Sequence, residues 1–600
     1  MPKIQMRRDS AANWKSVNPI LLVGEWALET DTKKMKIGDG STAYNSLPYS
    51  TVQDSDEWQK PADWVDIRSA ALQNSIYFLV GHSADYAAYP TFPIKATVSN
   101  SGTYDVFVDG VKQVTTASSS ITTLNWQTLA LTSGWDVTYP TALRTHIVRV
   151  TPSVSTNTIT AIQIKDGTDL GKGLLWAHFT LTNAISLQSF SNQSWLEAVT
   201  SSQESIKITG SSGLSGAFSH DSKLACVPAF DGNNETISLN TMFGLDSGYT
   251  IDRQRNNALK TVAFKNIKST NATNLFSGYT ALKEIKTENC LIEYGRGILG
   301  RCYALEKIPS FSFANSTRCD NAVLENEKLT NTVIDATDGK NITSLGIYAT
   351  AEHRADGMKG LTVSNEAPFD NATSPQLNVS YTGMSRAALV NLFKSMPYNV
   401  GYTVVGTPTI VDGVASGFSS SDYVQATSIL PDNIDTFELC IKYDNIAADN
   451  RLFRLGTASD TAYSLQTLSN KRIAWYGDDI IFISDKNVDD YTYVKVNTTN
   501  GLNSNVQIQV SNDGNSWETS TITTNTGNTT VRNSTPIFGR IVSGSIDLNH
   551  TYIKVNGVTW FNGKAAMTKT CSVVGCTGTA DLTADDKAIA TGKGWKLTVA

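Results

Sequence analysis

The sequence predicts a multidomain, mainly β protein: a small N-terminal oligomerisation module, a β-sandwich, a repeat solenoid and a second β-sandwich inserted near the end of the solenoid. Three observations predict this class. At 600 residues and 65.0 kDa the chain is too long for a single hydrophobic core. Asp-Gly and Asn-Gly pairs between alternating apolar residues indicate β-hairpins. Leucines in the middle of the chain recur at a regular spacing, which is typical of a solenoid.

Composition and charge exclude several classes of partner. The net charge is -6 and the basic residues are scattered, whereas a nucleic-acid-binding face needs clustered Lys and Arg. No apolar run approaches the roughly 18 residues that span a bilayer, and the N-terminus lacks the apolar core of a signal peptide. We therefore expect a soluble protein made in a cytoplasm, with no nucleic-acid partner and no membrane insertion.

The seven cysteines are an odd number, and none forms a CxxC pair. This pattern suggests neither a disulfide framework nor a zinc site. We expect reduced thiols that are mostly buried. A bridge between Cys571 and Cys576 is the alternative.

Residues 1–50 begin with a predicted short helix that Ser10 caps and that ends by Asn18, because Pro19 disfavours helical geometry in the residue before it. The strand-like segments ILLV and EWALE follow, and Asp39-Gly40 allows a sharp reversal. The segment has too few apolar side chains to be stable by burial alone. We expect it to pack against other chains, most simply copies of itself.

The stretches IQMRRDSAANWKSVNP and GEWALETDTKKMKIGDGSTAYNSLPY carry a family resemblance. In the order of their motifs they resemble the N-terminal module of many phage tail fibres and receptor-binding proteins. The resemblance implies a virion-proximal module that forms a homotrimer and contacts phage tail or baseplate proteins. It also implies a location in the virion, in the tail or tail fibre, after synthesis in the host cytoplasm.

Residues 51–185 show a β pattern. The Asp109-Gly110 pair stands between YDVFV and VKQV, so it predicts a hairpin, and the alternating apolar residues on either side suit a half-buried sheet. We interpret this region as a β-sandwich.

Residues 186–402 contain an internal repeat, seen in ALKTVAF, ALKEIKT, ALEKIPS and KLTNTVI. The period indicates a leucine-rich solenoid of α+β type, and it resembles the irregular repeats of bacterial surface antigens. In the upstream alignment Cys302 matches Tyr279, so we interpret it as a packed position and not as a reactive group. A helix capped by Ser385 and stopped by Pro397 is expected to close the array. The leading leucines are Leu259, Leu282, Leu305 and Leu329.

Residues 403–570 return to a β pattern, with hairpin signals at Asp513-Gly514 and Asn556-Gly557. The order of strands resembles the laminin-G and concanavalin-like jelly rolls of lectins. Residues 571–600 predict a helix with a capping-box-like start, Thr583 and Asp586, followed by a strand. We expect them to complete the solenoid cap, which would make the lectin-like domain an insertion.

The sequence does not indicate catalysis, a metal or a cofactor. The six histidines are dispersed, and HExxH, G-x-S-x-G and G-x-x-x-x-G-K motifs are absent. SNDGNSW approaches the box of sialidase-like propellers but occurs once, so a hairpin turn is the favoured interpretation. The NDGN segment could offer oxygen ligands to calcium, but such turns are common without metal.

A sugar-binding site requires an exposed aromatic face and nearby polar groups. The segment IAWYGDDI offers this combination at an expected strand end. The alternative, a core tryptophan beside a turn of aspartates, is favoured on general grounds. The candidate ligand-binding residues are Trp475, Tyr476, Asp478 and Asp479.

These observations predict a phage tail fibre or receptor-binding protein that is held to the virion by its N-terminus and adheres to bacterial surface polysaccharide or protein. Three alternatives remain: a structural baseplate or tail decoration, a polysaccharide depolymerase and a bacterial surface adhesin. A depolymerase needs only two suitably spaced carboxylates, which a sequence with 55 acidic residues does not reveal.

Overall fold

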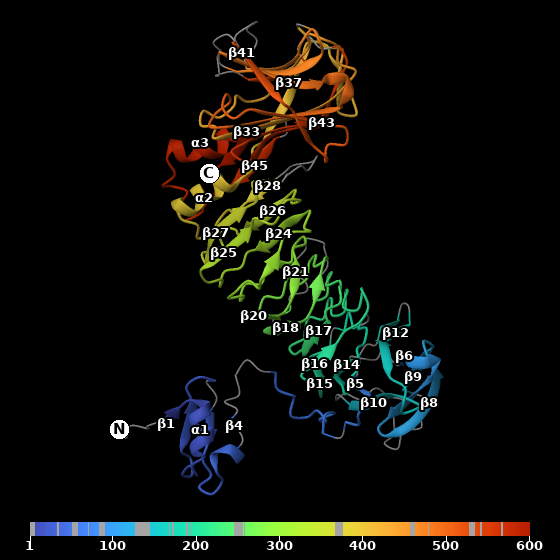
Figure 1. Ribbon diagram of the computed structural model, residues 1–600. Coiled ribbons are helices and arrows are strands. Elements are labelled where there is room, and N and C mark those ends of the chain that lie inside the picture. The colour runs from blue at the N-terminus through green and yellow to red at the C-terminus, as the bar shows by residue number, and fades with distance from the viewer. Residues whose placement is uncertain are drawn as a thin grey trace. The chain divides into compact units, whose positions relative to one another are not determined.

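The computed structural model describes residues 7–600 except 33–34, 48, 51–57, 70, 83–90, 127–143, 167–168, 171–172, 188–189, 194, 245–255, 257, 367–375, 420, 456–462, 478, 527–534, 540–542 and 566–567. The chain divides into two units, Met1–Asp66 and Ile67–Ala600. Most of the described secondary structure is strand, so the predicted mainly β class is confirmed (Figure 1).

The first unit is a four-stranded sheet with one helix against it. Ser10 caps helix α1 by accepting a hydrogen bond from the Asn13 amide, and the helix ends at Asn18, both as predicted. Trp14 from the helix stacks on Tyr44, with ring centroids 4.9 Å apart, and this pair centres a small core. The elements are β1 (Arg7–Asp9), α1 (Ala11–Val17), β2 (Trp26–Glu29), β3 (Met35–Ile37), the 3-10 helix η1 (Tyr44–Ser46) and β4 (Tyr49–Ser50).

The second unit begins with a β-sandwich. Its hairpin between β7 and β8 turns at Asp109 and Gly110, both with positive φ, as the sequence predicts. A six-stranded sheet runs in the order β15 (Ala198–Ser201), β14 (Leu174–Phe179), β5 (Ile76–His82), β10 (Arg144–Pro152), β7 (Thr103–Val108) and β8 (Val111–Ala117). A three-stranded sheet runs in the order β11 (Ile159–Gln163), β6 (Thr91–Val98) and β9 (Ile121–Asn125). Strand β12 (Lys165–Asp166) pairs with β13 (Asp169–Leu170), and the 3-10 helix η3 covers Ser99–Ser101.

A solenoid of parallel strands follows, and Figure 1 shows its strands in succession along this unit. One sheet contains β16 (Ser205–Lys207), β17 (Ala229–Asp231), β18 (Thr261–Lys265) and β20 (Glu284–Glu288), and another contains β19 (Lys268–Ser269), β21 (Leu291–Glu293) and β23 (Phe311–Ser312). A third sheet contains β22 (Leu299–Gly300), β24 (Cys319–Leu324), β26 (Leu345–Tyr348), β28 (Gln376–Asn378), β45 (Lys569–Ser572) and β46 (Trp595–Thr598). A fourth sheet pairs β25 (Thr332–Ala336) with β27 (Met358–Val363).

The repeated residues of the solenoid line its core. All four leading leucines are buried, and so is Cys302, whose thiol donates a hydrogen bond to the Phe276 carbonyl at 3.3 Å. Burial raises the pKa of the Cys302 thiol, which agrees with a packed position. The described part of residues 186–384 forms strands and turns without an α-helix, whereas the sequence interpretation expected α+β repeats.

The sandwich and the solenoid share one hydrophobic core. Strand β14 pairs antiparallel with β5 on one side and parallel with β15 on the other, so the sheet of the sandwich passes directly into the solenoid. Inside the solenoid, Phe218, Phe243 and Phe276 stack in turn, with centroids 5.5 and 5.3 Å apart. The aromatic rings of successive repeats therefore continue one apolar column.

A second β-sandwich has its own core. Its hydrogen-bonded strands run in the order β40 (Glu518–Thr519), β39 (Gln507–Ser511), β38 (Tyr493–Thr499), β33 (Thr436–Asp444), β43 (Ser545–Val555), β44 (Val558–Ala565), β29 (Val400–Val405), β32 (Tyr423–Ala426), β42 (Pro536–Phe538), β34 (Arg451–Leu455), β35 (Ser464–Thr467), β36 (Arg472–Tyr476), β37 (Ile480–Asn487) and β41 (Ile522–Thr526). Strand β30 (Thr409–Val411) pairs with β31 (Val414–Ser416), and the 3-10 helix η5 covers Val488–Asp490. The ring centroids of Phe437 on β33 and Trp475 on β36 are 5.9 Å apart. Strands that are far apart in the sheet order therefore face each other across the core.

The two chain segments that flank this sandwich meet in the solenoid cap. Strand β28 precedes the sandwich and pairs in parallel with β45, which follows it, placing Leu377 opposite Cys571. Helices α2 (Arg386–Ser395) and α3 (Ala584–Gly592) are joined by two hydrogen bonds from Arg386 to the Asp586 carboxylate, at 2.6 and 3.2 Å. Residues 400–565 therefore lie between neighbouring strands of one parallel sheet.

The cysteines are all free thiols, Cys571 and Cys576 included. Cys302, Cys319, Cys440, Cys571 and Cys576 are buried, which agrees with the expectation of reduced, mostly buried side chains.

We predict that Phe276→Ala lowers the free energy of unfolding by about 3–5 kcal/mol, because it leaves a cavity in the column of stacked rings. Urea denaturation of the full chain measures this change. Leu291→Ala, at an exposed solenoid position, is the control and is expected to stay within about 0.5 kcal/mol of wild type. Equal effects of the two substitutions would contradict a continuous core.

We predict a pH-dependent contribution from Asp586. The Arg386 guanidinium and the Thr583 amide hold the pKa of this carboxyl well below its usual range, so its stabilisation is complete above the usual value near 3.8 and is lost as pH falls through the lowered one. Asp586→Asn should lower Tm at pH 7 and approach wild type in strong acid. Asp585→Asn, an exposed neighbour in the same turn, is the control. A Tm difference that does not depend on pH would contradict this assignment.

Candidate functional sites

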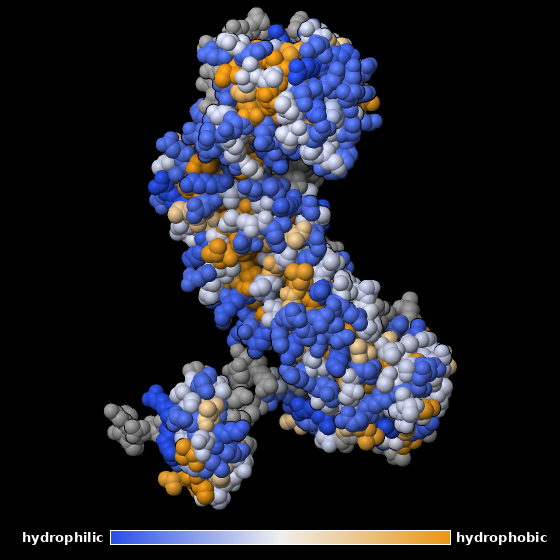
Figure 2. Space-filling model, viewed as in Figure 1, coloured by the Kyte–Doolittle hydropathy of each residue, from blue (hydrophilic) through white to orange (hydrophobic). Residues whose placement is uncertain are grey.

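The N-terminal unit presents an exposed apolar surface. Figure 2 shows hydrophobic residues gathered on one side of this small unit. Five large apolar side chains of this unit are exposed, and an exposed group of this kind marks an interaction surface. We call this set the apolar face: Val17, Ile20, Leu22, Val23 and Trp26, exposed by 70, 59, 73, 80 and 38 %.

Backbone contacts hold the apolar face outward. Leu21 is fully buried, and its carbonyl accepts a hydrogen bond from the Gly40 amide at 3.1 Å. The Leu22 amide donates to the Glu25 carboxylate at 2.8 Å, and this bond, with Arg7, lowers the pKa of Glu25. Because Leu21 points inward and these contacts fix the next residues, Leu22 and Val23 are directed to solvent.

The glycines of the K-I-G-D-G motif make this arrangement possible. A Cβ on Gly38 would lie 2.2 Å from the Leu22 carbonyl oxygen. A Cβ on Gly40 would lie 2.6 Å from a methyl group of Val23, and Gly40 also has a φ of +80°. The motif that carries the family resemblance therefore also positions the exposed loop.

The candidate sugar site at 475–479 does not have an exposed tryptophan. Trp475 is fully buried, stacks on Phe453 at 6.1 Å and donates its indole N–H to the Leu502 carbonyl at 3.0 Å. No face of the indole is available to a sugar ring, so the structure does not support Trp475 as a stacking surface. The alternative of a core tryptophan describes its surroundings.

Two other predicted site residues flank the turn from β36 to β37: Tyr476 ends β36, and Asp479 directly precedes β37. Tyr476 is half-buried, and burial raises the pKa of its hydroxyl. Asp479 is exposed with a φ of +57°, and Asp478 lies outside the described residues. Tyr476 and Asp479 therefore lie at the two ends of this turn, and Trp475 adds no exposed aromatic face.

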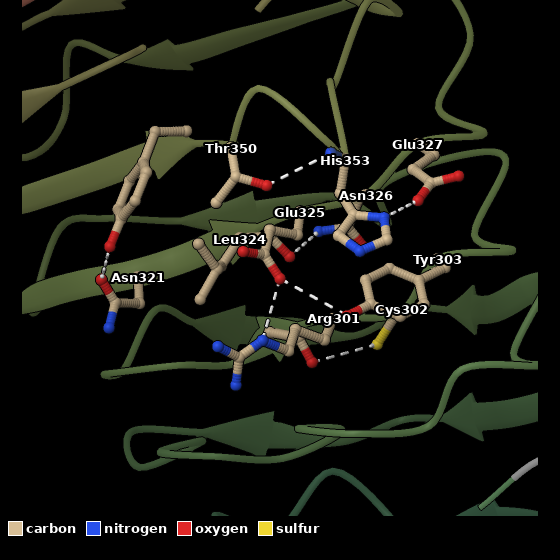
Figure 3. A network of polar contacts seen from close by, with 12 residues as sticks. Arg301, Cys302, Tyr303, Asn321, Leu324, Glu325, Asn326, Glu327, Thr350 and His353 are labelled. Atoms are coloured by element: carbon tan, nitrogen blue, oxygen red, sulfur yellow. Dashed lines mark hydrogen bonds and ion pairs between the residues drawn. The ribbon is translucent and has the colours of Figure 1, made fainter. Parts of the chain in front are cut away.

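A polar network crosses three turns of the solenoid (Figure 3). Arg301 Nε donates to the Glu325 carboxylate at 2.9 Å, and the Tyr303 hydroxyl lies 3.5 Å from the same group. The Tyr303 ring stacks on His353 at 4.8 Å, and His353 Nδ1 is hydrogen-bonded to Glu327. The network joins neighbouring repeats side by side and leaves the Tyr303 and His353 pair half-exposed.

Sequence reasoning missed this network, although the spacing contains a signal for it. Arg301 and Glu325 are 24 residues apart, and both have left-handed backbone conformations, with φ of 60° and 53°. Gly278 holds the preceding equivalent position, with φ of 87°. The amides of all three donate to a carbonyl of the next repeat, at Gly300, Leu324 and Tyr348. Arg301 and Glu325 thus occupy the repeat position that Gly278 holds in the preceding repeat, where the left-handed backbone conformation favours glycine.

The sequence motifs that suggested chemistry are structural turns. Asp513 in SNDGNSW accepts hydrogen bonds from the amides of Asn515 and Ser516 and from the Ser511 hydroxyl, which lowers the pKa of its carboxyl. The Lys495 Nζ lies over the Trp517 ring, 3.9 Å from the ring centroid. Among the described residues, no group of three His, Cys, Asp or Glu is placed to hold a metal ion. The helices in that part of the chain are all too short or too polar to cross a membrane.

Comparison with known proteins gives one match. Residues 4–42 match the family model described as the major tropism determinant N-terminal domain. No curated protein and no solved structure matches the chain. The matched segment contains the K-I-G-D-G motif and the whole apolar face, and it supports a phage tail or receptor-binding protein.

We predict that Arg301→Ala lowers the free energy of unfolding by about 1–3 kcal/mol, because it removes the cation that pairs with the buried Glu325 carboxylate. The double variant Arg301→Ala, Glu325→Asn should recover part of the loss, since asparagine carries no charge and tolerates left-handed backbone. Urea denaturation of the three chains measures both effects. A double variant less stable than Arg301→Ala would contradict this account.

Proposed function

We propose that this protein is a phage receptor-binding protein or tail fibre, attached to the tail or baseplate through its N-terminal unit and assembled as a homotrimer. The remainder of the chain carries out adhesion to the bacterial surface. The observation that supports the proposal most directly is the coincidence of two features in residues 4–42: the match to the tropism-determinant domain and the exposed apolar face.

The apolar face favours self-association. Complete burial of one Val or Leu side chain contributes about 1.5–3 kcal/mol, so five such side chains per chain form a substantial interface once they are covered. The unit has a small core of its own, centred on Trp14 and Tyr44, and gains most by packing against copies. A trimer repeats each adhesive site, and avidity can then exceed single-site affinity about 100-fold or more.

The proposed adhesive part consists of the solenoid and the second sandwich. We propose that the parallel solenoid is related to leucine-rich repeats and that the sandwich is lectin-like and binds bacterial surface polysaccharide or protein. The role is binding and not catalysis.

We predict that the paired substitution Leu22→Asp, Val23→Asp converts the trimer to a monomer, because covering charged side chains costs more than leaving them in water. Light scattering during size-exclusion chromatography gives the mass of each species. Val154→Asp, a change at an exposed valine of the second unit, is the matched control and should remain trimeric.

The same variants test attachment to the virion. Virions assembled with Leu22→Asp, Val23→Asp protein should lack it, whereas Val154→Asp protein should be incorporated and should support adsorption to host cells. A wild-type chain that is monomeric, or that is absent from purified virions, would contradict the proposed function.

A further inference from the structure

The second unit contains a cavity between its second sandwich and the solenoid cap. The cavity has a volume of about 360 Å³, which falls within the usual range of about 300–1,000 Å³ for small-ligand sites. Strands β43 and β44 of the sandwich form part of its wall, and the remainder comes from the segments that follow β27 and α2 and from the start of β45. A smaller cavity of about 20 Å³ shares Tyr398, Thr559 and Asn562 with the first.

The charged side chains of the cavity wall have partners within the protein. Lys554 pairs with Glu438 at 3.6 Å, and Glu366 pairs with Lys340 at 2.8 Å. The other two lysines of the wall likewise have interaction partners. An ionic ligand would have to displace one of these partners, whereas an uncharged ligand would not. The cavity therefore suits an uncharged ligand.

Uncharged polar groups of the wall retain the capacity for hydrogen bonds. The hydroxyls of Tyr398 and Thr559 have no hydrogen-bond partner among the described residues. Burial is the cause of the raised pKa of the Tyr398 hydroxyl, which agrees with the lack of such a partner. The side-chain oxygen of Asn562 accepts from the Lys564 amide at 3.3 Å, and its NH₂ group has no partner in the same part of the chain. Hydroxyls donate and accept, and a carboxamide NH₂ donates, so these three groups suit a ligand with several hydroxyls.

Tyr398 is held in position by its two neighbours in the chain. The Pro397 carbonyl accepts a hydrogen bond from the Trp595 indole N–H at 2.8 Å, and the Asn399 amide donates to the Lys593 carbonyl at 2.7 Å. The Lys593 Nζ lies 5.2 Å from the centroid of the Tyr398 ring. Tyr398 is half-buried, so part of its side chain stays accessible. A ring that is already ordered reduces the entropic cost of binding a ligand.

We propose that this cavity binds an uncharged saccharide unit of the bacterial surface. The inference rests on the proposed function and adds the chemical class of ligand and the place where it binds. An aromatic ring suits the C–H face of a sugar, and hydroxyl and carboxamide groups suit its hydroxyls. The ligand contacts Tyr398 next to the cap, and it contacts Thr559 and Asn562 on β44 of the sandwich.

The test is calorimetric titration of the full chain with galactotriose, mannotriose and tri-N-acetylchitotriose, and with trigalacturonate as the charged counterpart of galactotriose. Binding of a neutral probe with the same affinity at low and high salt supports the proposal, because no ion pair forms. Tightest binding of trigalacturonate overturns it, and so does failure of all three neutral probes to bind at millimolar concentration.

Variants locate the site. Tyr398→Phe and Thr559→Val each remove one hydroxyl and nearly keep the size of the side chain, so each should weaken binding of the neutral probe about two- to tenfold. Tyr402→Phe, at a half-buried position on β29, and Thr524→Val, at an exposed position on β41, are the matched controls, because neither residue lines the cavity. Both controls should bind as wild type. Unchanged affinity in both Tyr398→Phe and Thr559→Val would overturn the assignment.

The outcome is separable from the proposed function. A chain that is trimeric and present in virions but binds no neutral probe contradicts only the ligand inference. A chain that is monomeric and absent from virions contradicts the proposed function whatever it binds. Tm measured for each variant shows whether it is folded. Tyr398→Phe and Thr559→Val are expected to stay near the wild-type value, because the hydroxyls that they remove have no hydrogen-bond partner in the described part of the chain.

Discussion

The parallel pairing of β28 with β45 is the contact on which the organisation of the second unit depends. It joins Leu377 to Cys571 across almost two hundred residues of sequence, so the cap of the solenoid forms only when both ends of the intervening sandwich come together. The ion pair between Arg386 and Asp586 and the hydrogen bond from the Asn399 amide to the Lys593 carbonyl strengthen the same closure. The sandwich is therefore held by two chain connections to neighbouring interior strands of one sheet.

This closure also leaves a cavity between the sandwich and the cap. A domain attached through one linker would present a single hinge, whereas here Tyr398 and Lys569 lie on the outgoing and returning connections and face the same recess. The cap fixes the buried lysine, and the sandwich supplies amides and Tyr552 from β43 and β44. The wall of the cavity is thus assembled from two substructures.

The N-terminal unit shows the opposite design. Its core is small, glycines at positions 38 and 40 allow close turns, and the five apolar side chains of the apolar face are exposed. The second unit places its large aromatic rings inside, as in the column of Phe218, Phe243 and Phe276. One end of the chain leaves an apolar face exposed, and the rest is folded around its own two cores.

Sequence by itself determined the features that depend on neighbouring residues. Caps at Ser10 and Thr583, the hairpin at Asp109-Gly110 and the buried leucines of the repeat follow from short-range hydrogen bonds, from backbone preference and from periodicity. Tertiary structure alone decided that Arg301 reaches Glu325 and that Lys569 lines a cavity, and it decided between the two sequence interpretations of Trp475. Burial and contact depend on which distant strands pack together, and a local pattern does not contain that information.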